Sequence, residues 1–239
     1  MARLDDFDGE ALSRAGESIR QIARDATSME DASRRVVSFL YDDLRTADGE
    51  PALALARLYK THPYGKLPDD LRAFARAQLV GEPDGDEVRC LTLLGTRGVK
   101  AAWDDRRQSS GHKAIPLPSA EFVERLPMIA ALVGQLGLEV GDVVRPDPQR
   151  VPELSRRTYE IFHVPDAVGS PYVPAQDFVA EHGIRSALGF GGVMFSGDFF
   201  AVVLFSTVPV SAAVADRVRI LALSVRVALL PFGSRVFDG

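Results

Sequence analysis

The stretch that decides the fold is HGIRSALGFGGVMFSGDFFAVVLFS, residues 182–206. Two apolar runs of strand length flank Ser196-Gly197-Asp198, a tripeptide that is typical of a tight turn. This pattern predicts an antiparallel hairpin. A long apolar helix is expected from about Ser211, because apolar residues recur at spacings of four, three, four and three: Val214, Val218, Leu221, Val225 and Ala228. The chain therefore ends in a strand–turn–strand–helix unit.

The first apolar run contains the glycine cluster Gly189-Phe190-Gly191-Gly192. Glycine clusters that bind phosphates stand between a strand and a helix. This cluster leads into a hairpin instead, so we interpret its glycines as sites of a bulge or of close helix packing. Dinucleotide binding is rejected.

Two helices are predicted near the start of the chain. Apolar residues at spacings of three, four and three give the first helix, at about residues 11–24, a narrow stripe: Leu12, Ala15, Ile19 and Ile22. A narrow stripe suits pairing with one partner helix. Ser28 begins the second helix, with Asp31 placed as in a capping box. Its wide apolar face is expected to pack on a sheet.

Between these helices and the hairpin, the pattern alternates between strands and helices. Strands are expected at residues 52–59, 88–94 and 158–164, and short helices at about 69–79 and from Ser119. Pro127 must kink or restart the helix that begins at Ser119. Residues 95–118 are the least regular part of the chain.

The composition is that of an ordinary globular protein, with 46% hydrophobic residues and a net charge of −5 among 239 residues. Nucleic-acid binding is disfavoured, because it needs clustered Lys and Arg. The single cysteine, Cys90, excludes an internal disulfide and a multi-cysteine zinc site. The acidic N-terminus lacks an apolar signal core, and no apolar run reaches the roughly 20 residues of a membrane helix. We therefore expect a cytoplasmic protein, most simply a bacterial one, with no membrane partner.

The hairpin and the closing helix resemble the C-terminal half of a GAF domain, a small sensory module of signalling proteins. The resemblance covers residues 28–232, and leaves 1–27 as an N-terminal dimerisation helix and 233–239 as a tail. It implies an α+β fold with a central, mostly antiparallel sheet, helices packed on one face, and terminal helices forming a dimer bundle. It also implies a non-enzymatic, sensory or regulatory role.

Three other segments resemble bacterial GAF-like sensor modules found upstream of histidine kinases or phosphatases: YKTHPYG, DDRRQSSGHKAIPLP and FHVPDAVGSPYVP. No ligand is known for that group, so the resemblance names no binding residue in this chain. The Asn-Lys-Phe-Asp-Glu segment of cyclic-nucleotide GAF domains and the cysteine context of phytochrome-type GAF domains are both missing from the sequence. No kinase, phosphatase or DNA-binding output follows the module, so we expect either signalling through a separate partner or a detached sensor module.

The irregular segment supplies the candidate ligand site. Arg106 and Arg107 offer bidentate donors for a carboxylate or phosphate. His112 can orient that anion or titrate near neutrality, and Trp103 can form an apolar wall. Tyr172, in the proline-rich loop 165–174, is the fifth candidate. Alternatively, Asp104 and Asp105 pair with the two arginines in a solvated loop, and the loop carrying Tyr172 is an ordinary crossing.

Heme is the alternative ligand, since some GAF-like sensors hold heme through one histidine. His163 or His112 would be that ligand, and no compact metal motif is present among the histidines and Cys90. In the alternative interpretation His163 lies partly buried at the end of a strand, and its ring forms hydrogen bonds with the backbone. The cofactor is left unknown.

A small-molecule enzyme is the third hypothesis. Cys90 lies in a strand pattern, where a free cysteine is a small buried hydrophobe. Ser186 and Ser196 lack a Gly-x-Ser-x-Gly elbow. The sequence places no base beside a nucleophile, so we expect no catalytic residues.

Homodimerisation is expected through the first helix and the last one. The interface residues would be Leu12, Ile19, Ile22, Val218 and Val225. The last helix has a second apolar face at Ile220, Leu223, Val227 and Leu229, so that one face can cover the sheet while the other meets a partner chain.

Overall fold

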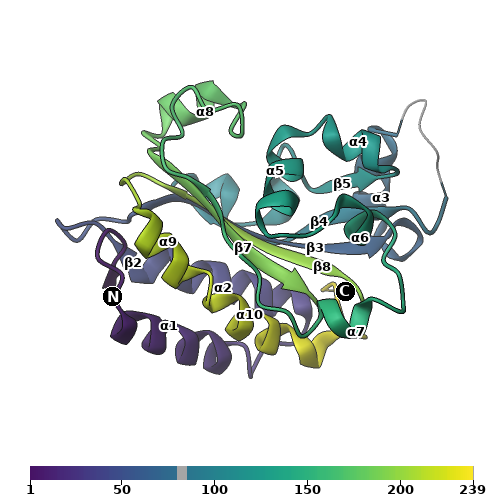
Figure 1. Ribbon diagram of the computed structural model, residues 1–239, viewed down its shortest axis with the longest axis horizontal. Coiled ribbons are helices and arrows are strands. Elements are labelled where there is room, and N and C mark those ends of the chain that lie inside the picture. The colour runs from purple at the N-terminus through teal and green to yellow at the C-terminus, as the bar shows by residue number, and fades with distance from the viewer. Residues whose placement is uncertain (80–84, 239) are drawn as a thin grey trace.

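The computed structural model describes residues 1–79 and 85–238. At its centre lies a six-stranded antiparallel sheet in the order β5-β4-β3-β8-β7-β6 (Figure 1). Its strands are β3 (Leu53–Pro63), β4 (Arg89–Gly98), β5 (Ala114–Leu117), β6 (Phe162–Val164), β7 (Ser186–Val193) and β8 (Phe199–Ser206). A short parallel pair, β1 (Ala2–Arg3) and β2 (Leu44–Arg45), stands apart from it. The predicted α+β class with a mostly antiparallel sheet is confirmed.

The predicted hairpin is the β7–β8 pair. Its register runs from Ser186 opposite Ser206 to Val193 opposite Phe199. The turn closes through a 2.8 Å hydrogen bond from the Met194 N–H to the Asp198 carbonyl. Gly197 supplies the positive φ of 81° that this turn requires.

Helices from the two ends of the chain cover one face of the sheet, as the resemblance implied (Figure 1). They are α1 (Gly9–Ile22), α2 (Met29–Asp43), α9 (Ala212–Val218) and α10 (Leu221–Leu229). The connecting segments cover the other face with α4 (Ala120–Glu124), α5 (Pro127–Gln135), α6 (Val140–Val144) and α8 (Gln176–Glu181). The remaining short elements are α3 (Asp69–Arg76), α7 (Val151–Leu154) and the 3-10 turns Tyr64–Lys66, Ala101–Trp103, Arg106–Gln108 and Leu230–Phe232.

Alternation along β8 divides the core into two parts. Phe200, Val202 and Leu204 lie on the side of α1, α2, α9 and α10. Phe199, Val203 and Phe205 face the connecting segments. Because successive strand residues point to opposite faces, each residue of β8 has a fixed side. Asp198, which directly precedes β8, follows the same alternation.

Two predicted helices are each divided. Pro127 restarts the helix begun at Ala120, standing at the first position of α5, where its missing N–H is not needed. The closing helix is interrupted at Arg219 and Ile220, between α9 and α10. Ser28 caps α2 as predicted, accepting a 2.9 Å hydrogen bond from the Asp31 N–H. The Asp31 carboxylate accepts from the Thr27 N–H at 3.2 Å rather than from the Ser28 N–H.

The narrow stripe of α1 pairs with a helix of its own chain. Ile19 on α1, Val218 on α9 and Val225 on α10 are at most 1% exposed, inside the core that these helices share with α2. Leu12 and Ile22 are half-buried at its margin. The three buried side chains therefore offer no surface to a partner chain, because packing within the chain already covers them.

The glycine cluster is structural. A Cβ on Gly189 would lie 2.5 Å from Cδ1 of Leu132 on α5, and one on Gly192 would lie 2.7 Å from the Tyr159 ring. A Cβ on Gly191 would overlap the Phe200 carbonyl oxygen across the hairpin. Close packing, the second of the two interpretations offered above, thus explains Gly189.

Candidate functional site

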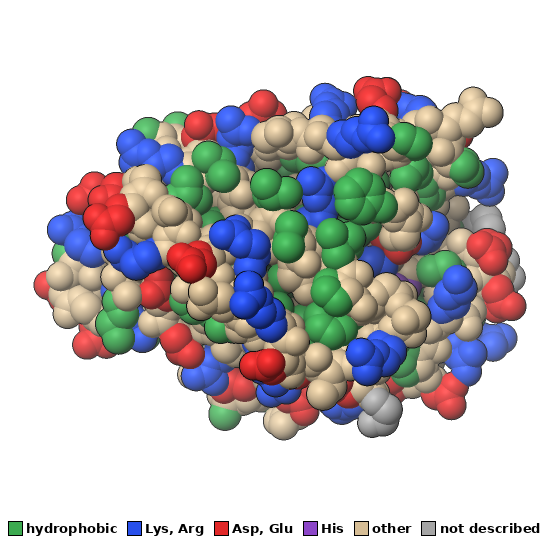
Figure 2. Space-filling model, turned by 90° about the horizontal axis from the view of Figure 1, so that it is seen from below, with side chains coloured by type: hydrophobic (Ala, Val, Ile, Leu, Met, Phe, Trp, Pro, Cys, Tyr) green, Lys and Arg blue, Asp and Glu red, His purple; other side chains and the backbone are tan. Residues whose placement is uncertain are grey.

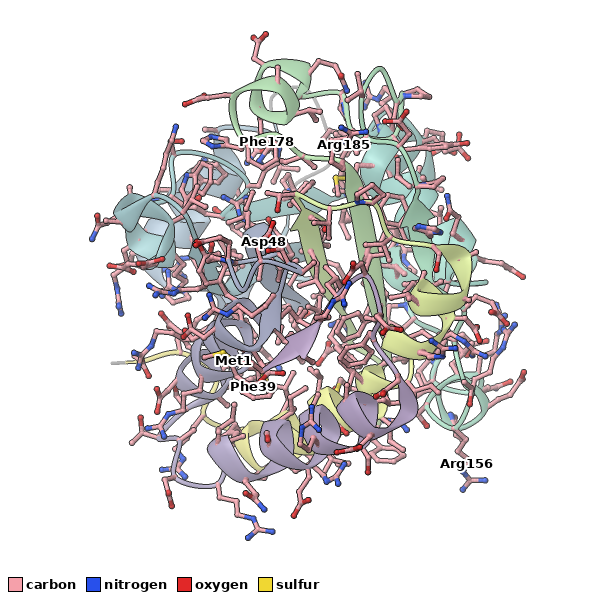
Figure 3. All side chains as sticks on the ribbon, turned by 90° about the vertical axis from the view of Figure 1, so that its left-hand side faces the viewer. Met1, Phe39, Asp48, Arg156, Phe178 and Arg185 are labelled. Carbon is pink, nitrogen blue, oxygen red and sulfur yellow. The ribbon has the colours of Figure 1, made fainter. Side chains whose placement is uncertain are left out.

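Trp103, the first predicted ligand residue, lies in a closed aromatic cluster. Its ring centroid is 5.7 Å from that of Phe178 and 4.8 Å from that of His182. Phe178 extends from α8 (Figure 3) and packs edge-on against Phe205 of the sheet. Lys100 lies 5.2 Å above the Trp103 ring. The contacts of the Trp103 ring therefore help to hold α8 against the sheet.

Arg106 is buried, and distant acids pair with it. Its Nε and Nη2 atoms donate to both carboxylate oxygens of Glu30 at 2.7 and 3.0 Å, and Nη1 donates to Asp70 at 3.2 Å. Local pairing with Asp104 and Asp105 does not occur for Arg106: Asp104 pairs with Arg97. Burial opposes the charge of Arg106, but the Glu30 and Asp70 carboxylates hold its pKa above the usual value.

The other predicted ligand residues do not converge on Arg106. Arg107 is half exposed, with Nη1 at 3.8 Å from Glu30. His112 has a positive φ of 59°, and burial, aided by the charge of Arg57, lowers its pKa. Tyr172 is 44% exposed in its loop. Arg106 and Arg107 line a pocket of about 330 Å³ whose walls do not include Trp103, His112 or Tyr172.

His163, the other candidate heme ligand, has a backbone partner. Its Nε2 atom is 2.9 Å from the Val210 carbonyl oxygen, which can only accept, so Nε2 carries the proton. Burial lowers the pKa of His163 despite that hydrogen bond. Within residues 1–79 and 85–238, no cluster of three or more His, Cys, Asp and Glu side chains is arranged to hold a metal ion. Heme binding stays a prediction, to be tested by a visible absorption spectrum after reconstitution.

The candidate nucleophiles have structural environments. Cys90 is fully buried, and burial raises the pKa of its thiol to about 12. Ser186 donates to the Pro165 carbonyl at 2.9 Å and accepts from the Val210 N–H at 3.0 Å. Ser196 donates to the Asp198 carboxylate at 2.7 Å. These contacts fix loops beside the sheet.

A larger pocket, of about 1160 Å³, opens where the N-terminus of α2 meets the ends of β3, β4 and β8. We call it the basic pocket. Its charged walls hold six Lys and Arg side chains against three Asp: Arg34, Arg35, Lys60, Lys66, Arg89 and Arg235, with Asp31, Asp198 and Asp238. Thr27, Ser28, His62, Pro63, Ser196 and the other residues of 233–238 complete the lining.

Two cations share one carboxylate at the floor of the basic pocket. Lys60 donates to Asp198 at 2.6 Å, and Arg89 also contacts Asp198. The side chains of Lys60, Asp198 and Arg89 are 5%, 14% and 18% exposed. Burial would raise the pKa of Asp198, but the charge and hydrogen bond of Lys60 hold it below its usual value. The trio carries a net positive charge in a poorly solvated place.

The ammonium of Lys60 fixes the tautomer of His62. Lys60 Nζ has three acceptors: Asp198, the Thr61 carbonyl at 3.3 Å, and His62 Nε2 at 3.2 Å. Because an ammonium can only donate, His62 Nε2 accepts and Nδ1 carries the proton. Burial, followed by the charge of Lys60, lowers the pKa of His62 to about 3, so its ring is neutral.

The His62 Nδ1–H is an unsatisfied donor. The residue is 4% exposed, and Nδ1 has no hydrogen-bond partner within the part of the chain that the structure describes. Buried donors without partners are rare and need an explanation. His62 lines the basic pocket, so a ligand oxygen there would satisfy it.

The upper wall of the basic pocket is the first turn of α2. Asp31 is 5% exposed and receives Arg34 at 2.5 Å and Arg35 at 3.0 Å. Burial would raise the pKa of Asp31, but Arg35 and the Thr27 N–H keep it lowered. Both arginines line the pocket and are more than a third exposed, and Arg35 also donates to the Ile22 carbonyl at 3.5 Å.

The sequence contained one signal for this site. Asp198 continues the alternation of Phe200, Val202 and Leu204, which places it on the helix-covered face. Lys60 and His62 are likewise two residues apart, on the same side of β3. Charged residues at inward positions mark a buried polar site, and our interpretation treated Asp198 only as a turn residue.

Comparison with known proteins finds similar folds but no family. No family profile and no curated protein matches the chain. Similar solved structures include the GAF domain of an Acinetobacter phosphoenolpyruvate-protein phosphotransferase (17% identity, 94% of this chain and 95% of that one, TM-score 0.47). The Coxiella burnetii counterpart has 14% identity, coverage of 92% and 93%, and a TM-score of 0.45.

A third similar structure is the phycoerythrobilin-bound GAF domain of a cyanobacterial phytochrome, with 10% identity, coverage of 93% and 97%, and a TM-score of 0.41. At these identities the likeness concerns the fold alone. Separately, no helix in residues 1–79 and 85–238 has both the length and the apolar character needed to cross a bilayer. The similarity to these GAF domains extends along more than nine-tenths of this chain, at TM-scores below 0.5.

Proposed function

We propose that this chain is a sensory or regulatory, non-enzymatic protein that binds a small anionic ligand in the basic pocket. The observation that carries the proposal is the wall of six Lys and Arg side chains against three Asp. Confined cations with an unsatisfied neutral donor favour an oxygen-rich anion over a neutral or cationic ligand. We keep the prediction that the ligand is an anion, but we assign its site to the floor of the basic pocket, formed by Lys60 and Arg89, instead of residues 103–112.

Calorimetric titration tests this proposal directly. Inorganic phosphate, pyrophosphate and succinate serve as anionic probes, and glucose as the neutral one, at constant ionic strength. Arg89→Gln is expected to weaken anion binding by about 10-fold to 100-fold, since a charge-assisted hydrogen bond contributes roughly 1.5–3 kcal/mol. Arg14→Gln is the matched control, because Arg14 is 53% exposed on α1, outside the basic pocket. Equal affinity in the two variants, or no heat with any anion, would refute the site.

The same proposal includes a homodimer that signals through a separate partner. We assign its interface to the outer face of α10 and the turn that follows: Ile220, Leu223, Val227 and Leu230, between 40% and 56% exposed. Their spacing of three, four and three forms one stripe, which can pair with itself about a two-fold axis. Figure 2 shows hydrophobic side chains gathered across the middle of this underside, with Lys and Arg around them.

Sedimentation velocity at micromolar concentration tests the dimer. Leu223→Asp is expected to give monomers without loss of fold, because Leu223 is 56% exposed. Val168→Asp introduces the same charge at a position that is 63% exposed on a distant loop, and should leave the dimer intact. A monomeric parent protein contradicts the dimer proposal and leaves the anion site untouched.

A further inference from the structure

The segment Gly233–Asp238 lies across the basic pocket and is fastened to the first turn of α2. The Met29 N–H donates to the Arg235 carbonyl at 2.9 Å, and the Glu30 N–H donates to the Val236 carbonyl at 2.8 Å. Ser28 Oγ donates to the Asp238 carboxylate. The Asp238 N–H donates in turn to Glu30 at 3.1 Å. The chain thus supplies its own acceptors to the helix N-terminus.

The groups that hold this segment are those that bind small oxyanions. A helix N-terminus presents free N–H groups and a positive dipole end, and α2 is 15 residues long. Here the acceptors are two carbonyls and one carboxylate from residues 235–238. A phosphate-type anion offers several acceptor oxygens with more charge, so it can replace them.

His62 gives an independent indication of the same ligand. Its Nδ1–H is unsatisfied, and the Phe237 ring lies 5.4 Å from its ring. Phe237 also lies 5.7 Å from the guanidinium of the buried Arg106. Phe237 therefore covers one donor without providing it an acceptor. Movement of Phe237 would open the His62 Nδ1–H to the basic pocket.

The carboxylates around the helix terminus do not forbid an anion. Glu30 is neutralised by Arg106, Asp31 by Arg34 and Arg35, and Asp198 by Lys60 and Arg89. Asp238 instead bonds the Ser28 hydroxyl. With residues 233–238 moved away, five Lys and Arg side chains line the pocket against two Asp. The excess of three positive charges is the same as with the segment in place, so its release exposes hydrogen-bond donors without making the site less favourable for an anion.

We propose that residues 233–238 are an internal occupant of the anion site, and that a phosphate-type oxyanion displaces them. The ligand takes the Ser28 hydroxyl, the N–H groups of Met29 and Glu30, and the His62 Nδ1–H. Binding is thereby coupled to release of the C-terminal segment. This inference rests on the proposed function, since it requires an anion in the basic pocket.

A fluorophore on Ser234→Cys reports release of the segment. Ser234 is exposed, whereas the only native cysteine, Cys90, is buried with a raised thiol pKa, so labelling is selective. Titration with inorganic phosphate and pyrophosphate is expected to lower the fluorescence anisotropy of the label. Sodium chloride at equal ionic strength should leave it unchanged.

Phe237→Ala in the unlabelled full-length chain tests the competition. With the anchor removed, phosphate affinity measured by calorimetry should rise about tenfold, because the binding-competent state is more populated. Tyr172→Ala, at an aromatic residue that is 44% exposed in the loop 165–174 and outside the basic pocket, is the matched control and should change nothing. If Phe237→Ala does not fold, Asp238→Asn, which removes only the competing charge, should give a smaller rise.

The outcomes separate the two proposals. Phosphate that binds parent and variants equally, with constant anisotropy, overturns the internal occupant and leaves the anion site standing. Binding to Phe237→Ala alone supports the internal occupant, since the segment then blocks the site in the parent. No anion binding to parent or variants overturns both.

Discussion

Phe237 packs near Arg106 of one charged cluster and near His62 beside a second, and the two clusters are balanced differently. Arg106 faces two carboxylates, from Glu30 and Asp70, and is closed off from solvent. Lys60 and Arg89 share the single carboxylate of Asp198 beside an open pocket. The first cluster completes its own charge pairing and serves the fold. The second cluster leaves one positive charge unpaired, and a ligand can pair with it. This difference distinguishes Arg106, which is structural, from Arg89, which we propose binds the ligand.

The largest expected effect comes from breaking the closed cluster. Glu30→Gln leaves the buried Arg106 without its bidentate partner, so the free energy of unfolding should fall by about 3–5 kcal/mol. Urea unfolding followed by circular dichroism measures this loss. A loss below about 1 kcal/mol would mean that Arg106 reaches solvent or another acid, and that the contrast between the two clusters is wrong.

Asp198→Asn should have a smaller effect that depends on anions. The substitution leaves Lys60 and Arg89 unpaired, and the expected loss is about 2–3 kcal/mol in a phosphate-free buffer. Added phosphate should restore more stability to this variant than to the parent, because the anion replaces the missing carboxylate. Thermal unfolding with and without phosphate provides the measurement, and equal stabilisation of both proteins would contradict an anion at this floor.

These two predictions use contacts that the sequence alone did not supply. The hairpin, the two N-terminal helices and the Pro127 restart were predictable, because alternation, capping and proline geometry are local. The partner of Arg106 was not, since Glu30 is 76 residues away along the chain and only the tertiary fold joins them. Residues 103–112 looked like a binding segment because their charges are adjacent in sequence.

The basic pocket was harder still to predict from the sequence. It joins the first turn of α2, three strand ends and the C-terminal segment. Only the inward position of Asp198, and the pairing of Lys60 with Phe200 across β3 and β8, could have indicated it. The proposed dimer interface was hard to predict for the same reason. The spacing identified both Ile19 and Leu223 as apolar helix positions, and only packing within the chain shows that Ile19 is buried and Leu223 is exposed.

Acid should destabilise the protein through His62. Its pKa is about 3 in the folded protein and near 6.5 when unfolded, so between these values the unfolded state binds more protons. Stability therefore falls as the pH is lowered through this range. From about pH 6.5 to about pH 5 the contribution of His62 should be roughly 2 kcal/mol.

The matched variant for this prediction is His62→Gln, whose side-chain oxygen can still accept from Lys60. Its unfolding free energy should depend less on pH, although His112 and His163, whose pKa values are also lowered, keep part of the dependence. Identical pH profiles for parent and variant would show that the pKa of His62 is the same in the folded and unfolded states.

The smallest effect is expected at the exposed neighbour of Arg106. Arg107 is 51% exposed, and its guanidinium lies 3.8 Å from Glu30. Arg107→Gln should change the unfolding free energy by less than about 0.5 kcal/mol. A loss comparable to that of Glu30→Gln would show that the closed cluster extends to the surface. The two arginines, adjacent in sequence, would then act as one unit.

The strand order has a consequence for synthesis of the protein. The two central strands, β3 and β8, pair residues as distant as Leu53 and Ser206. Until β8 leaves the ribosome, one edge of β3 keeps unpaired N–H and C=O groups between two uncovered apolar faces. The second strand of the hairpin, β8, is therefore also the strand that completes the pairing of β3. Folding is therefore a late, non-local event, and the nascent chain is most prone to aggregation just before residues 199–206 emerge.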